Sequence, residues 1–111
     1  MEWIETLDGA VIASDIEGNI IYLNNKATSN FEKHGEQKLI GTNLKDCHKD
    51  SSNQKIKEMM ETHEKNIYTI EKKGKKKLIY QAPWFKDGEF AGLVELSLEI
   101  PFDMPHFIRE V

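Results

Sequence analysis

Cysteine is nearly absent from this chain of 111 residues, which has Cys47 alone. A single cysteine excludes an internal disulfide and fits a reducing compartment. No apolar run approaches the roughly 20 residues that a membrane-spanning helix needs, and the N-terminus lacks the basic and then apolar pattern of a secretory signal. We therefore expect a cytoplasmic protein without a membrane partner.

An excess of positive charge is also lacking, because 15 lysines and arginines are outnumbered by 19 acidic residues, which gives a net charge of −4. A nucleic-acid partner is not expected, since no basic stripe is available to neutralise phosphates. One group of lysines surrounds Gly74 between two predicted strands, and we interpret it as a solvated hairpin tip that discourages edge pairing. Its members are Lys72, Lys73, Lys75, Lys76 and Lys77.

The length predicts one domain, and neither internal repeats nor a low-complexity linker interrupts it. We expect a short amphipathic helix or cap at residues 1–8, a folded domain at 9–101 and an apolar tail at 102–111. The cap places Trp3, Ile4 and Leu7 at helical spacing. The tail includes Phe107 and is too apolar to extend into water without a partner.

The residues from Leu78 to Ile100 predict the central hairpin of the fold. An Asp-Gly pair, Asp87-Gly88, separates two runs of aliphatic and aromatic residues, which is a strong signal for a two-residue turn. A regular register pairs Phe85 with Phe90, Trp84 with Ala91 and Tyr80 with Glu95. One face is then almost wholly apolar (Ile79, Gln81, Pro83, Phe85, Phe90, Gly92, Val94, Leu96, Leu98). The other is mixed (Leu78, Tyr80, Ala82, Trp84, Ala91, Leu93, Glu95, Ser97).

Two further strands are expected early in the chain, at Ala10–Asp15 and Ile20–Asn24, with a tight turn between them. Asn24 or Asn25 can cap a following helix, and Gly35 suits its end. A second helix is predicted from the capping box at Ser51–Gln54 to about Lys65, and a third strand at Asn66–Lys72. Strands followed by helices and a three-strand meander indicate an antiparallel sheet with helices on one face, an α+β domain.

With these residues in place, the sequence resembles the PAS domain family. The matching stretches are VIASDIEGNIIYLNN, the helix with Phe31, LIGTN at Leu39–Asn43 and GEFAGLVELSLEI, followed by Pro101. The resemblance implies a five-stranded antiparallel sheet in the order 2-1-5-4-3, with helices over one face and a small-molecule pocket between them.

The resemblance and the periodicity disagree about which face of the hairpin is covered. Periodicity buries the all-apolar face, whereas the resemblance turns the mixed face toward the pocket and leaves Ile79, Val94, Leu96 and Leu98 outside. We follow the resemblance. It implies an outer face covered by terminal segments or a second protomer, and the residues expected at that surface are Trp3, Ile4, Leu7, Ile79, Val94, Leu96 and Phe107.

The resemblance also limits the cofactors. Flavin photoreceptors of this fold carry a reactive cysteine after Gly-x-Asn, where this chain has Leu44, so a flavin photoadduct is not expected. Haem would need His48 or His63 as its ligand, because the helix region around Ile56 that holds the axial histidine in haem-binding relatives has none. Scattered histidines give little support to a zinc site.

The residues expected to contact a ligand are His48, Glu95, Tyr80, Trp84, Ser97, Cys47, Asn24 and Met59. An inward glutamate such as Glu95 needs a partner, because an unpaired buried carboxylate is costly. The candidates have structural alternatives: His48 bonding a loop carbonyl, Glu95 turned to solvent by a bulge that shifts the register, Tyr80 and Trp84 as core aromatics, and Met59 as adaptable core. Cys47 beside His48 lacks an orienting third group, so nucleophilic catalysis is not expected.

The sequence therefore predicts a sensory domain rather than an enzyme. It would bind a small molecule between sheet and helices, with an unidentified ligand, and signal through a homodimer and a separate effector protein. Two alternatives remain: a ligand-free interaction and dimerisation module, and a haem-based gas or redox sensor.

Overall fold

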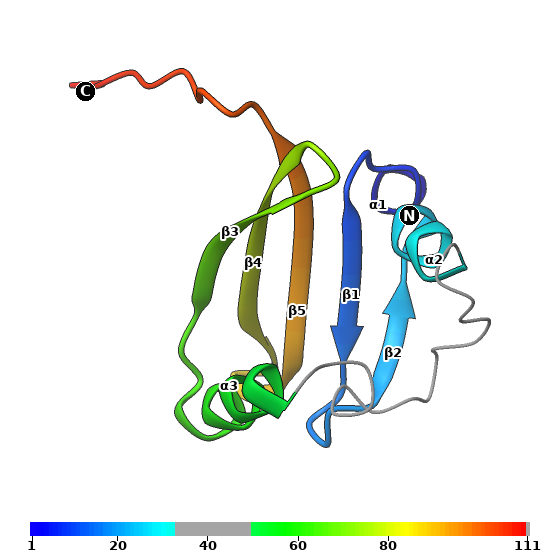
Figure 1. The fold of residues 1–111 in the computed structure, drawn as a ribbon. Coiled ribbons are helices and arrows are strands. Elements are labelled where there is room, and N and C mark those ends of the chain that lie inside the picture. The colour runs from blue at the N-terminus through cyan, green and yellow to red at the C-terminus, as the bar shows by residue number, and fades with distance from the viewer. Residues whose placement is uncertain (33–49, 111) are drawn as a thin grey trace.

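A five-stranded antiparallel sheet dominates the structure, a computed structural model that describes residues 1–32 and 50–110. Its strand order is β2-β1-β5-β4-β3 (Figure 1), as the resemblance predicted. The strands are β1 (Ala10–Ser14), β2 (Ile20–Leu23), β3 (Asn66–Lys72), β4 (Lys75–Lys86) and β5 (Glu89–Ile100). The helices are α1 (Glu2–Glu5), α2 (Asn25–Glu32) and α3 (Asp50–Thr62).

The helix boundaries differ modestly from those expected. The helix predicted from the capping box at Ser51 is present as α3, which ends at Thr62 rather than near Lys65. It ends there because His63 takes a left-handed φ of 59° and its N–H donates to the Met59 carbonyl, a C-terminal cap that stops the helix. The predicted stop at Gly35 lies outside the described residues.

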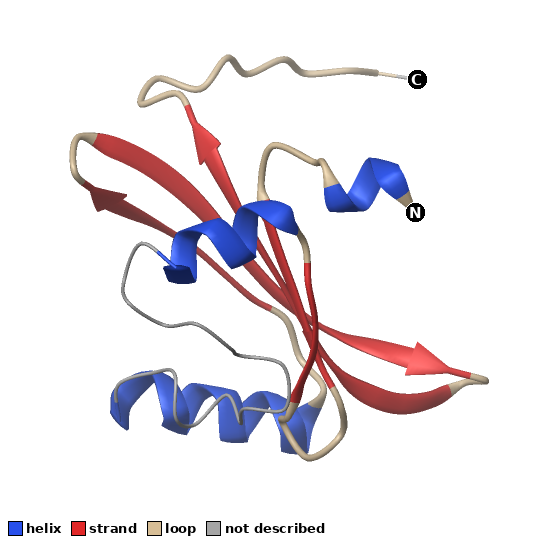
Figure 2. Ribbon diagram, turned by 90° about the vertical axis from the view of Figure 1, so that its right-hand side faces the viewer, coloured by secondary structure: helices blue, strands red, loops and turns tan. Residues whose placement is uncertain are grey.

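The core lies between one face of the sheet and the helices α2 and α3. Ala27 of α2 and Ile56 and Met59 of α3 form a single cluster with strand residues, and both helices lie on that side of the sheet (Figure 2). The strand members of the cluster are Ala10, Ile12, Ile20 and Leu93. The predicted α+β arrangement is confirmed, and we call the helix-covered side the inner face.

A β-bulge in β5 sets which side chains reach the inner face. Phe85 pairs with Phe90 and Lys86 with Glu89, as predicted, but Trp84 pairs with Gly92 instead of Ala91. The inserted residue shifts every later pair by one, so Tyr80 faces Leu96 and Gln81 faces Glu95. Gly92 is required there, because a Cβ on it would overlap the Ser14 carbonyl group and its φ is 152°.

The bulge corrects the face assignment on one strand and leaves it intact on the other. The prediction that Tyr80, Ala82 and Trp84 point toward the helices is wrong, because β4 places them on the outer face. Ile79, predicted outside, is buried on the inner face beside Ser97. On β5 the prediction is confirmed: Leu93, Glu95 and Ser97 lie inward, and Val94, Leu96 and Leu98 lie outward.

The outer face carries rows of apolar side chains that cross several strands. Because paired residues of neighbouring antiparallel strands share a face, the register places four residues in one row. It runs from β3 to β1 as Ile67, Tyr80, Leu96 and Val11. Ile67, at the edge of the sheet, is 52% exposed.

The two ends of the chain do not bury their apolar side chains within this structure. The N-terminal helix is shorter than predicted and leaves Leu7 outside it, while Trp3 is 62% exposed. The tail beyond Pro101 runs away from the end of β5 (Figure 1), and Phe107 is 72% exposed. The tail does not cover the sheet of its own chain, and the expectation that terminal segments or a second protomer cover the outer face stays a prediction. Among the described residues, no helix is long and apolar enough to cross a membrane.

Candidate functional site

Three polar side chains form a hydrogen-bonded series across β3, β4 and β5 on the inner face. Asn66 Nδ2 donates to Gln81 Oε1 at 2.8 Å, and Gln81 Nε2 donates to Glu95 Oε1 at 2.6 Å. Gln81 is only 8% exposed, so its amide needs these partners. The register created by the bulge makes the series possible, because it sets Gln81 between Asn66 and Glu95.

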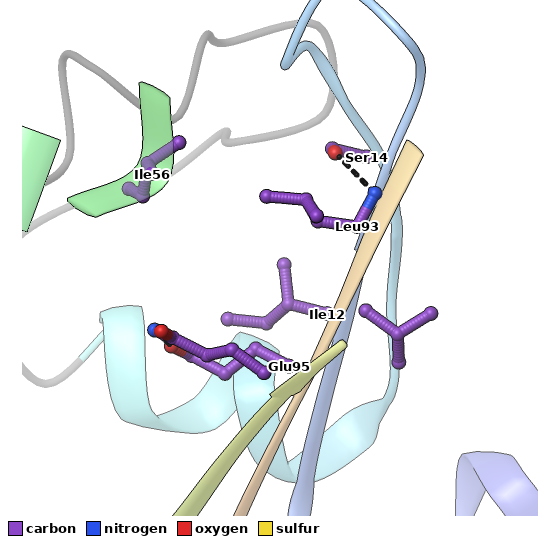
Figure 3. Close-up of a pocket in the computed structure, with 7 residues that line it drawn as sticks. Ile12, Ser14, Ile56, Leu93 and Glu95 are labelled. Atoms are coloured by element: carbon purple, nitrogen blue, oxygen red, sulfur yellow. Dashed lines mark hydrogen bonds between the residues drawn. The ribbon is translucent and has the colours of Figure 1, made fainter. Parts of the chain in front are cut away.

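Glu95 lies at the edge of a small cavity between the sheet and α3. Glu95, Leu93 and Ile12 project from the sheet on the side of Ile56, which belongs to α3 (Figure 3). Ser14, Gln81 and Val94 complete the described lining. The cavity volume of about 20 Å³ gives room for roughly one water molecule. The described walls are mainly apolar, with the Glu95 carboxylate, the Gln81 amide and the Ser14 hydroxyl as the polar groups.

Tyr68 is coupled to the same carboxylate from β3. It pairs with Ile79, which places it on the inner face beside this polar series. Burial, together with the negative charge of Glu95, raises the pKa of the Tyr68 phenol above its usual value of 10.0. Both effects disfavour the tyrosinate, so Tyr68 keeps its proton, and with it a hydrogen-bond donor, at neutral pH.

Asn24 has a structural role that leaves nothing for a ligand. Its Oδ1 accepts from the backbone N–H groups of Val11 and Ala27, and its Nδ2 donates to the carbonyls of Ile4 and Gly9, all within 2.8–3.0 Å. Two donors and two acceptor positions are the whole capacity of an amide. The predicted cap of α2 is confirmed. The expected ligand contact from Asn24 stays a prediction, and these four bonds argue against it.

The other predicted site residues separate into different environments. Trp84 lies on the outer face across Gly92, and its indole N–H donates to the Ser14 carbonyl at 2.9 Å. Tyr80 shares that face, away from the cavity. Met59 is fully buried in the core cluster, which matches its structural alternative. Ser97 is on the inner face but lies nearer the lysine-bearing hairpin tip than Glu95 does.

Histidine and cysteine contribute little to the described site. His48 and Cys47 lie outside the described residues, so their predicted contacts stay predictions. His63 is exposed at the end of α3, where its ring stacks on Phe90 with centroids 4.0 Å apart. Within residues 1–32 and 50–110, no three His, Cys, Asp or Glu side chains are grouped to hold a metal ion.

Sequence reasoning missed Gln81, Tyr68 and Ser14. Gln81 stood out as the lone amide on an otherwise apolar predicted face, and that oddity was the available signal. The buried Ser14 hydroxyl accepts from the Leu93 N–H at 3.1 Å, beside the bulge (Figure 3). This contact depends on a register that the sequence did not reveal.

Comparison with known proteins agrees with this architecture. A family model described as PAS domain matches residues 7–90. The chain belongs to the PAS domain family. Such domains are generally sensory rather than catalytic, and structures similar to this one include sensor regions of histidine kinases. No curated protein sequence matches the chain.

Solved PAS-like structures resemble this PAS domain in fold at low sequence identity. A C-terminal domain from Streptococcus mutans has a TM-score of 0.70 and 18% identity, covering 88% of this chain and 80% of its own. The PAS domain of histidine kinase ThkA has a TM-score of 0.64 and 22% identity, covering 82% and 98%. The Aer2 receptor from Vibrio cholerae, described as a dual PAS-haem oxygen sensor, has a TM-score of 0.62 and 18% identity, covering 84% and 95%.

The described residues of this PAS domain do not fit a haem group. No histidine is among the described residues that line the cavity, and the cavity itself is far smaller than a porphyrin. His63 faces Phe90 and Phe85 instead. His48, the other histidine predicted as a haem ligand, lies outside the described residues, so no step of the proposed function is routed through haem.

Proposed function

We propose that this PAS domain is a sensor for a small molecule that binds at the inner-face cavity and is anchored by Glu95 and Gln81. The observation that carries the proposal is the series Asn66–Gln81–Glu95, which ends in a carboxylate at an otherwise apolar cavity. A polar network inside a domain costs stability unless every member is satisfied. A ligand that bonds to Glu95 would complete this network, which would account for a charged residue inside the domain.

The free hydrogen-bonding capacity indicates the chemistry of the ligand. Glu95 Oε1 accepts from Gln81, whereas Oε2 makes no hydrogen bond within the described residues. A carboxylate oxygen only accepts, so the ligand should present an N–H or O–H group. Apolar contacts from Ile12, Ile56 and Leu93 would enclose the remainder. The proposal is therefore a small amine, amide or alcohol with an apolar body.

Binding of anything larger than water requires the cavity to widen. Ile56 is the lining residue contributed by α3, and the described contacts between α3 and the sheet are few compared with those between strands. A shift of α3 away from Leu93 is the least costly way to enlarge the space. Occupancy would then change the position of α3, and the signal would be a shift of population between two positions of this helix.

Native mass spectrometry of the protein purified from its own host tests the proposal. Glu95→Gln keeps the shape of the side chain and removes the charge, while Glu89→Gln makes the same change at an exposed position of β5. We expect a co-purifying compound that wild type and the Glu89→Gln variant retain and the Glu95→Gln variant loses. A compound held equally by all three proteins, or none in any, would contradict the proposal.

A second function, homodimerisation through the outer face, is favoured by the apolar rows on that face. Ile67, Tyr80 and Leu96 stand side by side on three neighbouring strands. Ile67 is exposed, and Tyr80 and Leu96 are half-buried; adjacent apolar side chains that stay accessible are typical of a protein contact. We propose that a second copy of the chain covers it, and that a separate effector protein reads the state of the dimer. The cytoplasmic location that Cys47 suggests belongs to the same proposal.

A further inference from the structure

A second hollow lies at the other end of the inner face from α3, beside the tip of the β3–β4 hairpin. Both α2 and the hairpin tip lie at this end of the sheet, where β5 leaves it (Figure 1). The hollow has a volume of about 760 Å³, in the range of small-molecule sites. Its described lining comprises Asp8, Gly9, Lys26, Asn30, Lys72, Lys73, Lys75, Lys77, Ser97, Glu99, Ile100 and Pro101.

Positive charge is concentrated in this hollow although the whole chain carries a net charge of −4. Five lysines and two carboxylates line it, which leaves an excess of three positive charges. Lys26 lies 3.4 Å from Asp8, and Lys75 lies 3.5 Å from Glu99. Within the described residues, Lys72, Lys73 and Lys77 have no ion-pair partner, so three ammonium groups are available.

The arrangement is more specific than a solvated hairpin tip. The alternation of β4 places Lys75 and Lys77 on the inner face and Lys76 on the outer one, and Lys76 is absent from the lining. A further lysine, Lys26, comes from α2, far from the hairpin in sequence. Residues that only kept a sheet edge from pairing would not need to converge on one hollow.

Holding these lysines together also destabilises the tip of the hairpin. Lys72 and Lys75 are direct cross-strand partners at the end of β3 and β4. Like charges in directly opposed positions destabilise an antiparallel pair. An anion between them would remove this repulsion, so the geometry is one in which binding and local stability favour each other.

We propose that this hollow binds a small soluble ligand carrying clustered phosphate groups. Lysine ammonium groups offer three donors each and bind phosphate as point charges, and here several of them surround one space. The described lining has no aromatic ring, so the phosphates rather than a stacked base would be recognised. The site is separate from Glu95 and its cavity, and the inference does not depend on the function proposed above.

Tripolyphosphate is a suitable probe, titrated into the full chain while backbone amide resonances are followed by NMR at about 0.15 M salt to screen weak surface charges. We expect saturable shifts for residues of the hairpin tip and for Lys26. Lys72→Gln combined with Lys77→Gln should weaken binding by about 10-fold or more, since two charged contacts are lost. Lys65→Gln combined with Lys86→Gln, which removes equal charge outside the hollow, should change it less than about 2-fold.

Thermal unfolding separates lost binding from lost folding. Because Lys72→Gln removes the repulsion with Lys75, the hollow variant should unfold at the same temperature as wild type or a higher one. Glu95→Gln should bind tripolyphosphate as wild type does, which distinguishes this site from the cavity. Equal weakening by both lysine pairs, or no saturable shift up to about 10 mM probe, would overturn the proposal.

Discussion

Polar side chains in this PAS domain differ in how much of their hydrogen-bonding capacity the fold uses. Asn24 uses every donor and acceptor position of its amide on backbone groups. Glu95, on the inner face, uses one carboxylate oxygen, and the other makes no hydrogen bond within residues 1–32 and 50–110. The sequence analysis named both residues as expected ligand contacts. Counting hydrogen bonds against capacity is what assigns one to structure and the other to the candidate site.

Replacing Asn24 by alanine should cost about 2–4 kcal/mol of unfolding free energy, because two buried backbone N–H groups lose their acceptor and α2 loses its cap. Asn25→Ala, at the neighbouring exposed position, should cost less than about 0.5 kcal/mol. Urea denaturation of both variants measures the difference. Similar values for the two would show that the four contacts of Asn24 contribute little.

Tyr68 gives the domain a dependence on alkaline pH. Its pKa is raised in the folded state, so folding favours the protonated phenol. The resulting stabilisation is complete below the unfolded value near 10 and is lost as the pH rises through the higher folded value. The unfolding free energy of the wild type should therefore fall as the pH rises above about 10, and that of the Tyr68→Phe variant should fall less.

Glu95→Gln separates the two causes of this shift. Ultraviolet titration of tyrosinate, with Tyr68→Phe used to assign the signal, should show a lower pKa for Tyr68 in the glutamine variant. Burial would still hold it above the ordinary value. An unchanged titration midpoint would mean that the charge of Glu95 does not reach the phenol.

At the scale of the elements, the bulge in β5 is the feature that local sequence signals did not reveal. Asp87-Gly88 predicted the turn correctly, because both residues take positive φ there, 52° and 81°. The strand β3 was predicted with its observed bounds, Asn66–Lys72. The glycine at position 92 looks like any small residue in a strand. Its role depends on contact with Ser14, nearly 80 residues away, which no local pattern contains.

The same shift explains why two sequence arguments disagreed about the faces. Periodicity was right for β4 and the resemblance was right for β5, since each strand alternates regularly on its side of the bulge. A regular register between β4 and β5 cannot satisfy both arguments, so the predicted faces of one strand had to be wrong. The hydrogen-bonded series through Gln81 and Glu95 could therefore not be predicted, although both residues belong to the predicted hairpin.

Two glycines offer a matched test of the bulge. Gly92→Ala should destabilise by about 3 kcal/mol or more, because a Cβ would overlap the Ser14 backbone, which cannot move without breaking the sheet. Gly88→Ala has open space around the added Cβ, so only its positive φ is strained, at about 1 kcal/mol. Thermal unfolding compares them. Equal losses would mean that β1 and β5 separate easily at the bulge.

For the whole molecule, the two faces of the sheet have different tasks in the proposed function. The inner face holds the core, the cavity and the basic hollow. The outer face holds apolar rows that stay partly exposed in a single chain. A sensor needs such a division, because a ligand and a partner must both contact the same sheet without competing for one surface.

Dimerisation through the outer face can be tested at an exposed position. Ile67→Glu should raise the dimer dissociation constant by about 10-fold or more, because it buries a charge in the apolar row. Ile16→Glu makes the same change at a residue that is 60% exposed in the β1–β2 turn. Analytical ultracentrifugation reports both constants. A wild-type monomer, or equal effects of the two changes, would contradict the proposed dimer.

The chain enters and leaves the sheet at the same end, since β1 begins beside Ser97 and β5 ends three residues later at Ile100. Ala10, which begins β1, is paired with Ser97 near the end of β5, and partners in such strands lie only about 5 Å apart. A host protein could therefore carry this domain as an insertion, spliced through two adjacent attachment points, with little strain on the host backbone. Each attachment point would connect directly to an interior strand of the sheet. A conformational change in the domain would therefore reach the host protein over a short distance.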